Sequence, residues 1–284
     1  MPPQANSDAR ARLLVLSAGC LWSLGGVFIK LLELHPLTIV FYRSFFASVF
    51  FLIFVRPTGW RFTPAVLVSV MSYTAAISAF VWANKLTTAA NAIVLQYTAP
   101  IFVFLFAALW FRESVAKRNL KTLVAGMVGI AIIFGSSRAP ADLWGVSAAV
   151  LSGLLFAVYM TNLRFLQKIA PASLTFVNNL ACWLTLFPVV RTDLVLSLDQ
   201  VLTLATMGVV QLGIPYFLFS KGLEKISLQE ASLIVLIEPV LNPIWVALTI
   251  GELPAAATVV GGSIILLGLA LRYFPERARP KPLS

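Results

Sequence analysis

The sequence has little charge, little cysteine and almost no histidine. Of its 284 residues only 11% are charged, while two are Cys and one is His. A soluble domain carries about 25% charged residues, so this chain has too few to cover a water-facing surface. Cys20 and Cys182 fall inside apolar runs and give no disulfide framework. The composition therefore excludes a soluble globular enzyme, a disordered protein and a secreted disulfide scaffold.

The chain has instead a series of long apolar runs. A helix that crosses a bilayer needs about 20 mostly apolar residues. Two runs carry one interior charge each, Arg43 in Leu37–Val55 and Glu238 in Ala231–Gly251. Eight others have none: Leu13–Ile29, Phe62–Asn84, Leu86–Phe111, Thr122–Arg138 up to its terminal Arg, Leu143–Leu163, Ile169–Val190, Gln200–Ser220 and Leu253–Leu271. Because the runs are continuously apolar rather than alternating, they predict an all-α membrane protein with ten transmembrane helices.

The surplus of basic residues predicts the orientation of these helices. The chain has 21 Lys and Arg against 11 Asp and Glu, a net charge of +10. With the amino terminus inside, sixteen of the 21 fall on the inner side, and only Lys30, Lys85, Arg138 and Arg191 fall outside. Short loops rich in Lys and Arg stay in the cytoplasm. We expect an inner (plasma) membrane protein with cytoplasmic tails, 1–11 and 275–284, and no nucleic-acid partner, because the basic residues are dispersed.

An internal repeat divides the ten helices into two halves. Pro100 is followed thirteen residues later by Glu113, and Pro239 is followed at the same distance by Glu252. Each half holds five predicted helices. Because five is odd, the second half enters the membrane from the opposite side, and such inverted repeats are typical of secondary transporters that work by alternating access. The predicted repeats are residues 12–138 and 142–274.

These features carry a family resemblance. The two Pro–Glu blocks, Leu-Trp-Ser at 21–23 and Phe-Tyr-Arg-Ser at 41–44 resemble the EamA-type family of the drug/metabolite transporter superfamily over about residues 12–272. The resemblance implies a basket of ten helices around a central substrate cavity, with the fifth and tenth helices at the periphery. It also implies export of amino acids or other metabolites, and the aromatic/neutral amino-acid exporter branch is the most similar.

Two ionisable residues lie inside the predicted spans. Placing a charged side chain in the bilayer costs free energy, so each of the two is expected to have a structural or functional role. Glu238 is a candidate ligand for a substrate ammonium group or a proton-coupling carboxylate. It precedes Pro239, whose missing N–H frees a carbonyl one turn earlier and can open the helix. The structural alternative is that Glu238 pairs with Arg43 or caps backbone at the kink. For Arg43 we favour a structural role.

Polar and aromatic residues near the prolines supply the other candidate substrate contacts. Gln96 and Pro100 are four residues apart and share a helix face, and Gln211 and Pro215 repeat that spacing. A cavity for an amino acid needs hydroxyl or amide donors, an acceptor for the ammonium and apolar walls. The predicted substrate-binding set is Trp22, Ser78, Trp82, Gln96, Tyr97, Tyr159, Asn162, Gln211, Tyr216 and Glu238. The predicted structural or gating set is Arg43, Pro100, Glu113, Pro215, Pro239 and Glu252.

Small residues indicate close packing of the fifth and tenth predicted helices. These two helices carry Gly126, Gly129, Gly261, Gly262 and Gly268, and glycines let helix backbones approach closely in membranes. The pattern suits contact within the bundle or a homodimer seam. The sequence leaves monomer and homodimer open.

No motif for metal, cofactor or nucleotide chemistry is present. His35 falls in a short outer loop, and the chain contains neither a His-Glu-x-x-His run nor a phosphate-binding Gly-Lys-Ser/Thr loop. All four Asp residues lie outside the predicted spans. We therefore expect no metal, no cofactor and no enzymatic activity.

The leading hypothesis is a secondary transporter that exports amino acids, above all aromatic or neutral ones. Facilitated diffusion and proton exchange through Glu238 are both open. The alternatives are export of drugs, organic cations or other metabolites and, from another class, an intramembrane enzyme or a lipid-binding scaffold.

Overall fold

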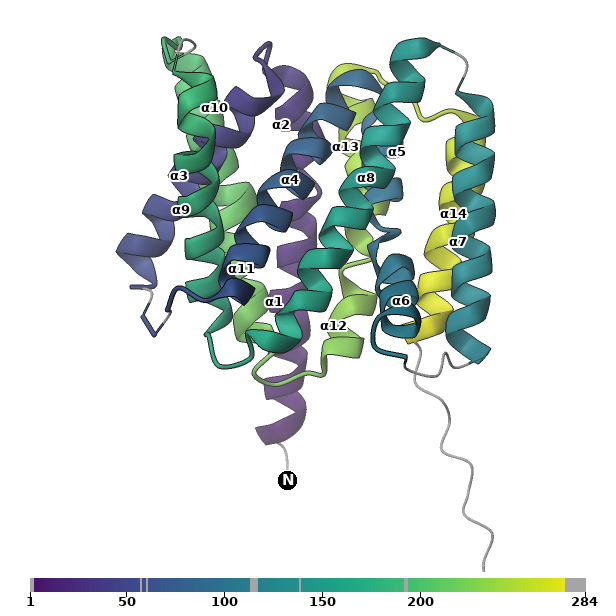
Figure 1. Cartoon of the computed structure of the whole chain (residues 1–284), viewed down its shortest axis with the longest axis horizontal. Coiled ribbons are helices and arrows are strands. Elements are labelled where there is room, and N and C mark those ends of the chain that lie inside the picture. Colours follow the sequence, from purple (N-terminus) through teal and green to yellow (C-terminus); the bar gives the residue numbers. More distant parts are fainter. Residues whose placement is uncertain are drawn as a thin grey trace, which may run out of the picture.

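The computed structural model describes residues 3–56, 58–59, 61–112, 117–137, 139–191 and 194–273. These residues form a bundle of helices standing side by side, with no strand among them (Figure 1). Eight helical segments are long and apolar enough to cross a membrane, and two shorter apolar helices, Leu120–Ser136 and Ala256–Arg272, complete the set. The prediction of an all-α protein with ten membrane helices is confirmed.

Six of the ten spans are single helices in the described residues. They are α3 (Pro36–Phe54), α4 (Pro64–Leu86), α7 (Lys117–Ser136), α8 (Pro140–Asn162, followed by the short η1, Leu163–Phe165), α9 (Pro171–Val190) and α14 (Ala256–Tyr273). Four of these helices have proline in the first turn, where its missing N–H costs no intrahelical bond. Thr63 caps α4 by accepting from the Val66 backbone N–H at 3.2 Å. Proline and a capping side chain thus set where these spans begin.

The other four spans are interrupted near their middles. The first span consists of α1 (Pro3–Trp22) and α2 (Gly25–Leu31), and the fourth of α5 (Ala89–Gln96) and α6 (Ala99–Leu109). The eighth span consists of α10 (Leu198–Thr206), the π-helix η2 (Met207–Gly213) and α11 (Ile214–Gly222). The ninth span consists of α12 (Leu228–Ile234) and α13 (Ile237–Ile250). Pro100, Pro215 and Pro239 follow three of the interruptions, as expected where a proline cannot donate to the preceding turn. The break in the first span has no proline.

The interruptions in the fourth and ninth spans repeat one another. Thr88 caps α5 by accepting from Asn91 N at 3.1 Å, and Ser227 caps α12 by accepting from Glu230 N at 3.1 Å. In each half the capping residue lies twelve positions before the proline that follows the break, Pro100 or Pro239. The same local plan therefore occurs in two five-helix halves, which the odd number of helices places in inverted orientation.

Helices α7 and α14 pack along each other at one edge of the bundle (Figure 1). A Cβ atom on Gly129 would lie 2.6 Å from the Gly261 carbonyl oxygen, and one on Gly261 would lie 2.7 Å from the Gly129 carbonyl oxygen. Gly126, Gly262 and Gly268 also face neighbours in the same chain. The glycine faces serve contact within the bundle, and the oligomeric state stays a prediction.

This contact predicts a stability effect. Gly129→Leu is expected to force α7 and α14 apart at the Gly261 carbonyl, and overpacking of this kind costs about 1–3 kcal/mol. The thermal midpoint of the purified protein in detergent should therefore fall. Gly135→Leu on the same helix is the matched control, because no atom lies within 4 Å of a Cβ there. Equal midpoints for the two variants would contradict the packing assignment.

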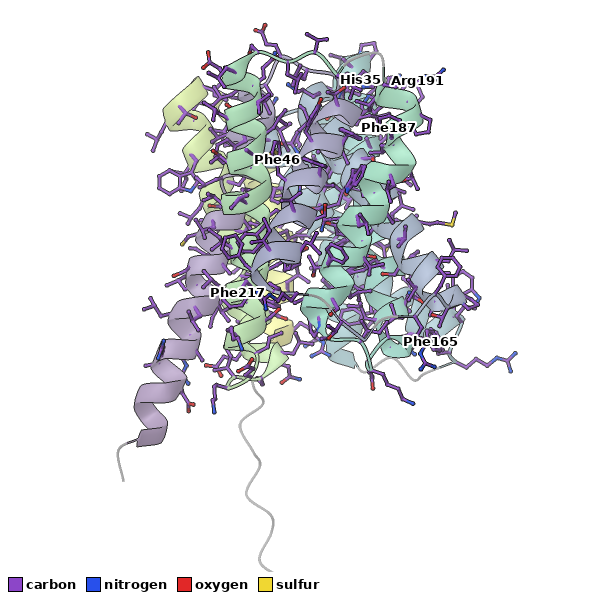
Figure 2. The ribbon with its side chains drawn as sticks, turned by 90° about the vertical axis from the view of Figure 1, so that its left-hand side faces the viewer. His35, Phe46, Phe165, Phe187, Arg191 and Phe217 are labelled. Carbon is purple, nitrogen blue, oxygen red and sulfur yellow. The ribbon has the colours of Figure 1, made fainter. Side chains whose placement is uncertain are left out.

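The two ends of the bundle are distinguished by their side chains. His35 and Arg191, both predicted to lie outside, lie at the end opposite the amino terminus, whereas Phe165 lies toward the other end (Figure 2). The predicted topology requires His35 and Arg191 to share one side. From here on "outer end" means the end with His35, and "inner end" the end where α1 begins.

Candidate functional site

The breaks of the two halves meet at a tyrosine and a glutamate. Tyr97 is the C-cap residue that follows α5, and Glu238 is the second residue of α13. The Tyr97 hydroxyl donates to Glu238 Oε2 at 2.7 Å and lies 3.0 Å from the Val235 carbonyl oxygen, where α12 ends. One side chain from the first repeat thus contacts both a carboxylate and a freed carbonyl of the second. Both residues were in the predicted substrate-binding set.

An aromatic wall stands at the break of the first span. Trp22, the last residue of α1, lies edge-on to Tyr216 with ring centroids 5.0 Å apart, and 5.4 Å from the ring of Phe219. Tyr216 follows Pro215 at the start of α11 and lies in the electrostatic neighbourhood of Glu238. Aromatic pairs in this geometry are favourable beyond their buried area. The wall supplies apolar surface in the electrostatic neighbourhood of Glu238.

The break of the first span is held open by side chains from the second half. Gln211 Nε2 donates to the Trp22 carbonyl at 3.1 Å, and Asn242 Nδ2 donates to the Ser23 carbonyl at 3.0 Å. Carbonyls freed inside a membrane need such partners. Gly26 leaves room for the Asn242 side chain, because a Cβ atom at residue 26 would lie only 2.6 Å from Asn242 Oδ1. Gln211, a predicted substrate contact, thus has one amide hydrogen bond in a structural role.

Arg43 does not pair with Glu238. Arg43 lies in α3 with 4% of its surface exposed, and it forms no ion pair with any described residue. Its electrostatic neighbours are Tyr73, Tyr216, Cys182 and Glu238. The structural alternative in which the two membrane charges neutralise each other in direct contact is therefore wrong.

Tyr73, an electrostatic neighbour of Arg43, packs against a second tyrosine, Tyr159. Tyr159, a predicted site residue, lies 5.7 Å from Tyr73 between ring centroids, and the Tyr73 hydroxyl donates to Asn179 Oδ1 at 3.3 Å. Tyr159 also interacts electrostatically with Tyr216. Tyr73 was not predicted as a site residue, because one Tyr inside an apolar run gives no spacing signal.

Three predicted site residues have other contacts, and a fourth has no hydrogen-bond partner. Trp82 is 38% exposed and lies edge-on to His35 at the outer end, with ring centroids 5.3 Å apart. Asn162 Nδ2 donates to the Ala65 carbonyl at 2.7 Å, and Gln96 Nε2 donates to Ser152 Oγ at 2.9 Å. These bonds tie neighbouring helices together. The fourth, Ser78, has a buried hydroxyl with no hydrogen-bond partner in the described part of the chain.

The predicted structural and gating residues divide into three groups. Pro100, Pro215 and Pro239 each lie in the first turn of the helix that follows a break, a position that fits the predicted structural role. Glu113 lies outside the described residues. Glu252 forms part of a polar network at the outer end.

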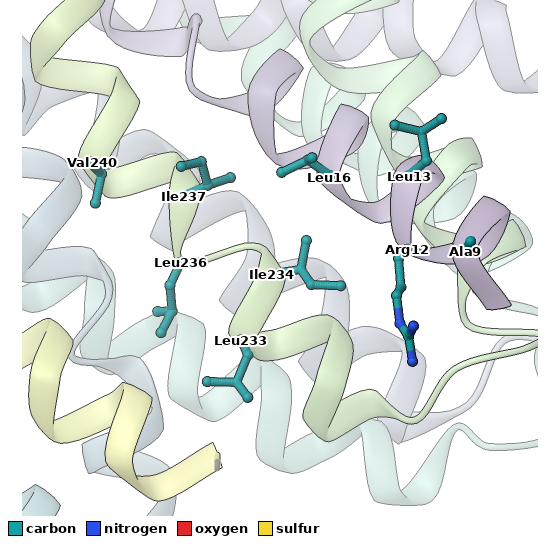
Figure 3. Close-up of a pocket in the computed structure, with 9 residues that line it drawn as sticks. All are labelled: Ala9, Arg12, Leu13, Leu16, Leu233, Ile234, Leu236, Ile237 and Val240. Atoms are coloured by element: carbon teal, nitrogen blue, oxygen red, sulfur yellow. The ribbon is translucent and has the colours of Figure 1, made fainter. Parts of the chain in front are cut away.

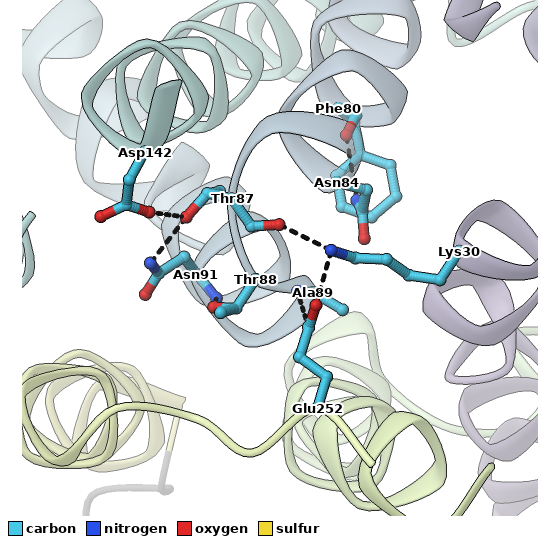
Figure 4. A network of polar contacts seen from close by, with 9 residues as sticks. All are labelled: Lys30, Phe80, Asn84, Thr87, Thr88, Ala89, Asn91, Asp142 and Glu252. Atoms are coloured by element: carbon cyan, nitrogen blue, oxygen red, sulfur yellow. Dashed lines mark hydrogen bonds and ion pairs between the residues drawn. The ribbon is translucent and has the colours of Figure 1, made fainter. Parts of the chain in front are cut away.

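Glu252 pairs with Lys30 at the outer end (Figure 4). Lys30 Nζ lies 2.6 Å from Glu252 Oε2 and donates to the Thr87 carbonyl at 2.8 Å, while Glu252 Oε1 accepts from the Ala89 backbone N–H at 2.8 Å. A carboxylate at a helix N-terminus is also favoured by the helix dipole. These contacts join α2, the turn between α4 and α5, and the segment between α13 and α14.

The network continues into two more spans. The Thr87 hydroxyl donates to Asp142 at the start of α8, and it accepts from Asn91 Nδ2 at 2.8 Å. Asn91 Oδ1 in turn accepts from Thr258 Oγ1 of α14 at 2.6 Å. We call Lys30, Thr87, Asn91, Asp142 and Glu252 the outer clamp. It ties helices of both repeats together at one end.

The inner end is hollowed between α1 and α12–α13 (Figure 3). A groove of about 560 Å³ is lined by Ala9, Arg12, Leu13, Leu16, Leu233, Ile234, Leu236, Ile237 and Val240. Arg12 Nε lies 2.6 Å from Glu230 Oε1, so a polar pair borders an otherwise apolar surface. Ile237 directly precedes Glu238, and the groove therefore reaches the break in the ninth span. None of the ten predicted substrate contacts lines it.

Comparisons with known proteins agree on a transporter. An uncharacterized transporter of Archaeoglobus fulgidus is 27% identical over 92% of this chain and 94% of its own length. The uncharacterized transporter YxxF of Bacillus subtilis is 25% identical over 65% of this chain and 61% of its own length. A crystal structure with 18% identity superimposes with a TM-score of 0.64 over 93% of this chain and 97% of its own, which shows the fold.

The family itself is shown by a match that covers both halves. The sequence model of the EamA-like transporter family matches residues 9–135 and, a second time, residues 143–274. The resemblance inferred from the Pro–Glu blocks is thereby confirmed, and the protein is a multi-pass membrane transporter. This chain belongs to the EamA-like transporter family.

Proposed function

We propose that this transporter exports amino acids with aromatic or other neutral side chains across the inner membrane, with both of its termini in the cytoplasm. The observation that carries the proposal is the bond between Tyr97 and Glu238, which joins the breaks of the two repeats. A half-buried carboxylate near an aromatic wall suits a substrate that has one ammonium group and an apolar body. The remaining polar contacts fix the helix breaks around this pair.

The clamp at the outer end and the groove at the inner end support transport by alternating access. The outer clamp joins spans of both repeats, while the groove between α1 and α12–α13 reaches the Glu238 break from the inner end. A substrate from the cytoplasm would reach Glu238 through this groove. Rocking of the two repeats would then break the clamp and close the groove. The direction is export if substrate enters from the inner end.

Two coupling modes are compatible with one membrane carboxylate in the site. In facilitated diffusion the metabolite gradient alone drives export. In proton exchange Glu238 releases substrate when it takes up a proton from outside. A pH gradient across the membrane accelerates transport only in the second mode.

Export of drugs or other organic cations is the alternative transporter function, since Glu238 also attracts a cation without a carboxylate. A binding panel distinguishes the two. A ligand that binds the folded protein raises its thermal midpoint. We expect stabilisation of the purified transporter by L-phenylalanine, L-tryptophan, L-tyrosine and L-leucine, but not by L-aspartate, L-lysine or tetraphenylphosphonium. Stabilisation by tetraphenylphosphonium alone would overturn the amino-acid proposal.

A further inference from the structure

We propose that Arg43 binds the substrate carboxylate, so that the site recognises a zwitterion at both ends: Arg43 at the carboxylate and Glu238 at the ammonium. This inference rests on the proposed function and deepens it. It replaces the purely structural role that the sequence favoured for Arg43.

The first observation is that Arg43 has no ion-pair partner and an unsatisfied Nε among the described residues. Its side chain is 4% exposed, its Nε is buried without a hydrogen-bond partner, and it forms no ion pair, all among the described residues. A buried charge is costly unless it is paired and hydrogen-bonded. The other membrane charge, Glu238, has a strong partner in Tyr97. Of the two membrane charges, Arg43 is therefore the one that lacks a directly bonded partner among the described residues.

The second observation is the position of Arg43 relative to Glu238. The two come from different repeats, Arg43 from α3 and Glu238 from α13, and each acts on the other electrostatically without direct contact. Tyr216 lies in the electrostatic neighbourhood of both charges, and Trp22 packs against Tyr216. One aromatic pair is thus a neighbour of two opposite charges. That is the arrangement required by a substrate with a carboxylate, an ammonium and an apolar side chain.

The third observation is that the backbone at Arg43 is held rigidly. The π-helix η2 packs against it so closely that a Cβ on Gly208 would lie 2.7 Å from the Arg43 carbonyl oxygen and 2.5 Å from Phe46 Cβ. π-helical turns occur frequently at functional sites. A fixed backbone sets the point from which the Arg43 side chain extends, and the planar fork of its guanidinium matches a carboxylate.

Substrate analogues that lack one charge test the proposal. The probes are L-phenylalanine, its amide and phenethylamine, which lacks the carboxylate altogether. We expect the wild-type protein to bind L-phenylalanine about tenfold or more tightly than either analogue, because a hydrogen bond to a charged group is lost. In Arg43→Gln the affinity for L-phenylalanine should fall by a similar factor, while that for phenethylamine changes less than about twofold. Arg43→Lys should restore part of the discrimination.

The controls separate the possible failures. Arg191→Gln removes an exposed arginine at the outer end and should leave all three affinities unchanged. Equal wild-type affinities for the three probes would overturn the proposal, as would equal weakening of all three in Arg43→Gln. If Arg43→Gln does not fold, the wild-type comparison decides alone. If the wild type binds no amino acid, the proposed function itself has failed.

Discussion

Glu238→Gln is expected to lower amino-acid transport about 100-fold. Truncating one partner of a buried, hydrogen-bonded charge pair costs about 2–5 kcal/mol, and the substrate ammonium would lose its anion here. Gln is nearly isosteric and can still accept the Tyr97 hydrogen bond, so the fold should survive. Flux of labelled L-phenylalanine into proteoliposomes, at equal protein content, measures the effect.

Two further variants make the Glu238 experiment specific. Glu230→Gln removes a carboxylate of the same span that pairs with Arg12 at the inner end, and it should keep flux within about twofold. Tyr97→Phe removes only the hydroxyl bonded to Glu238 and should lower flux about tenfold. A Glu238→Gln protein with wild-type flux would rule out Glu238 as the ammonium ligand. If the flux of the Glu238→Gln protein also did not change with a pH gradient, proton coupling through Glu238 would be excluded.

Lys30→Met is expected to release the outer clamp and to expose the space beneath it. Lys30 and Glu252 are only 16% and 24% exposed at their side chains, so their ion pair is poorly screened. Removing one partner should shift the equilibrium toward an outward-open state by about 1–3 kcal/mol, or about 5–150-fold. A cysteine at Val27, which is 8% exposed and lies in the cluster with Ala89 and Val246, reports this opening.

The labelling rate of that cysteine is the measurement. Cys20 and Cys182 are first replaced by Ala, and a membrane-impermeant maleimide is added to the outer side. Labelling should accelerate at least about fivefold in Lys30→Met. Lys221→Met, which breaks an exposed pair with Glu224, is the matched control and should not change the rate. An unchanged rate in Lys30→Met would show that the clamp does not hold the outer end shut.

Most of the fold could be predicted from local composition. Hydropathy indicated ten spans because lipid demands long apolar helices, and the recurrence of Pro100 as Pro239 indicated the repeat. The break after Trp22 could not be predicted in this way. It depends on Gln211 and Asn242, which lie 189 and 219 positions away from the carbonyls that they bind. Long-range partners of this kind leave no local spacing signal.

The candidate site was predictable where a residue was unusual for its surroundings. Glu238 was identified because a carboxylate in a membrane span needs a reason, and Tyr97 because it neighbours the Pro100 block. Helical spacing could not show which polar residues face the centre, so Trp82 entered the set although it packs on His35. Lys30 was counted only as an outer basic residue, because its partner Glu252 comes from the other repeat.

The central claim is that a neutral amino acid crosses the membrane through the site between the two repeats. Counterflow of labelled L-phenylalanine into proteoliposomes that contain only this protein and an excess of unlabelled L-phenylalanine tests it most directly. The account predicts saturable accumulation that L-tryptophan inhibits and tetraphenylphosphonium does not. Accumulation no greater than in protein-free vesicles, for L-phenylalanine and for every other amino acid tested in the same way, would contradict it.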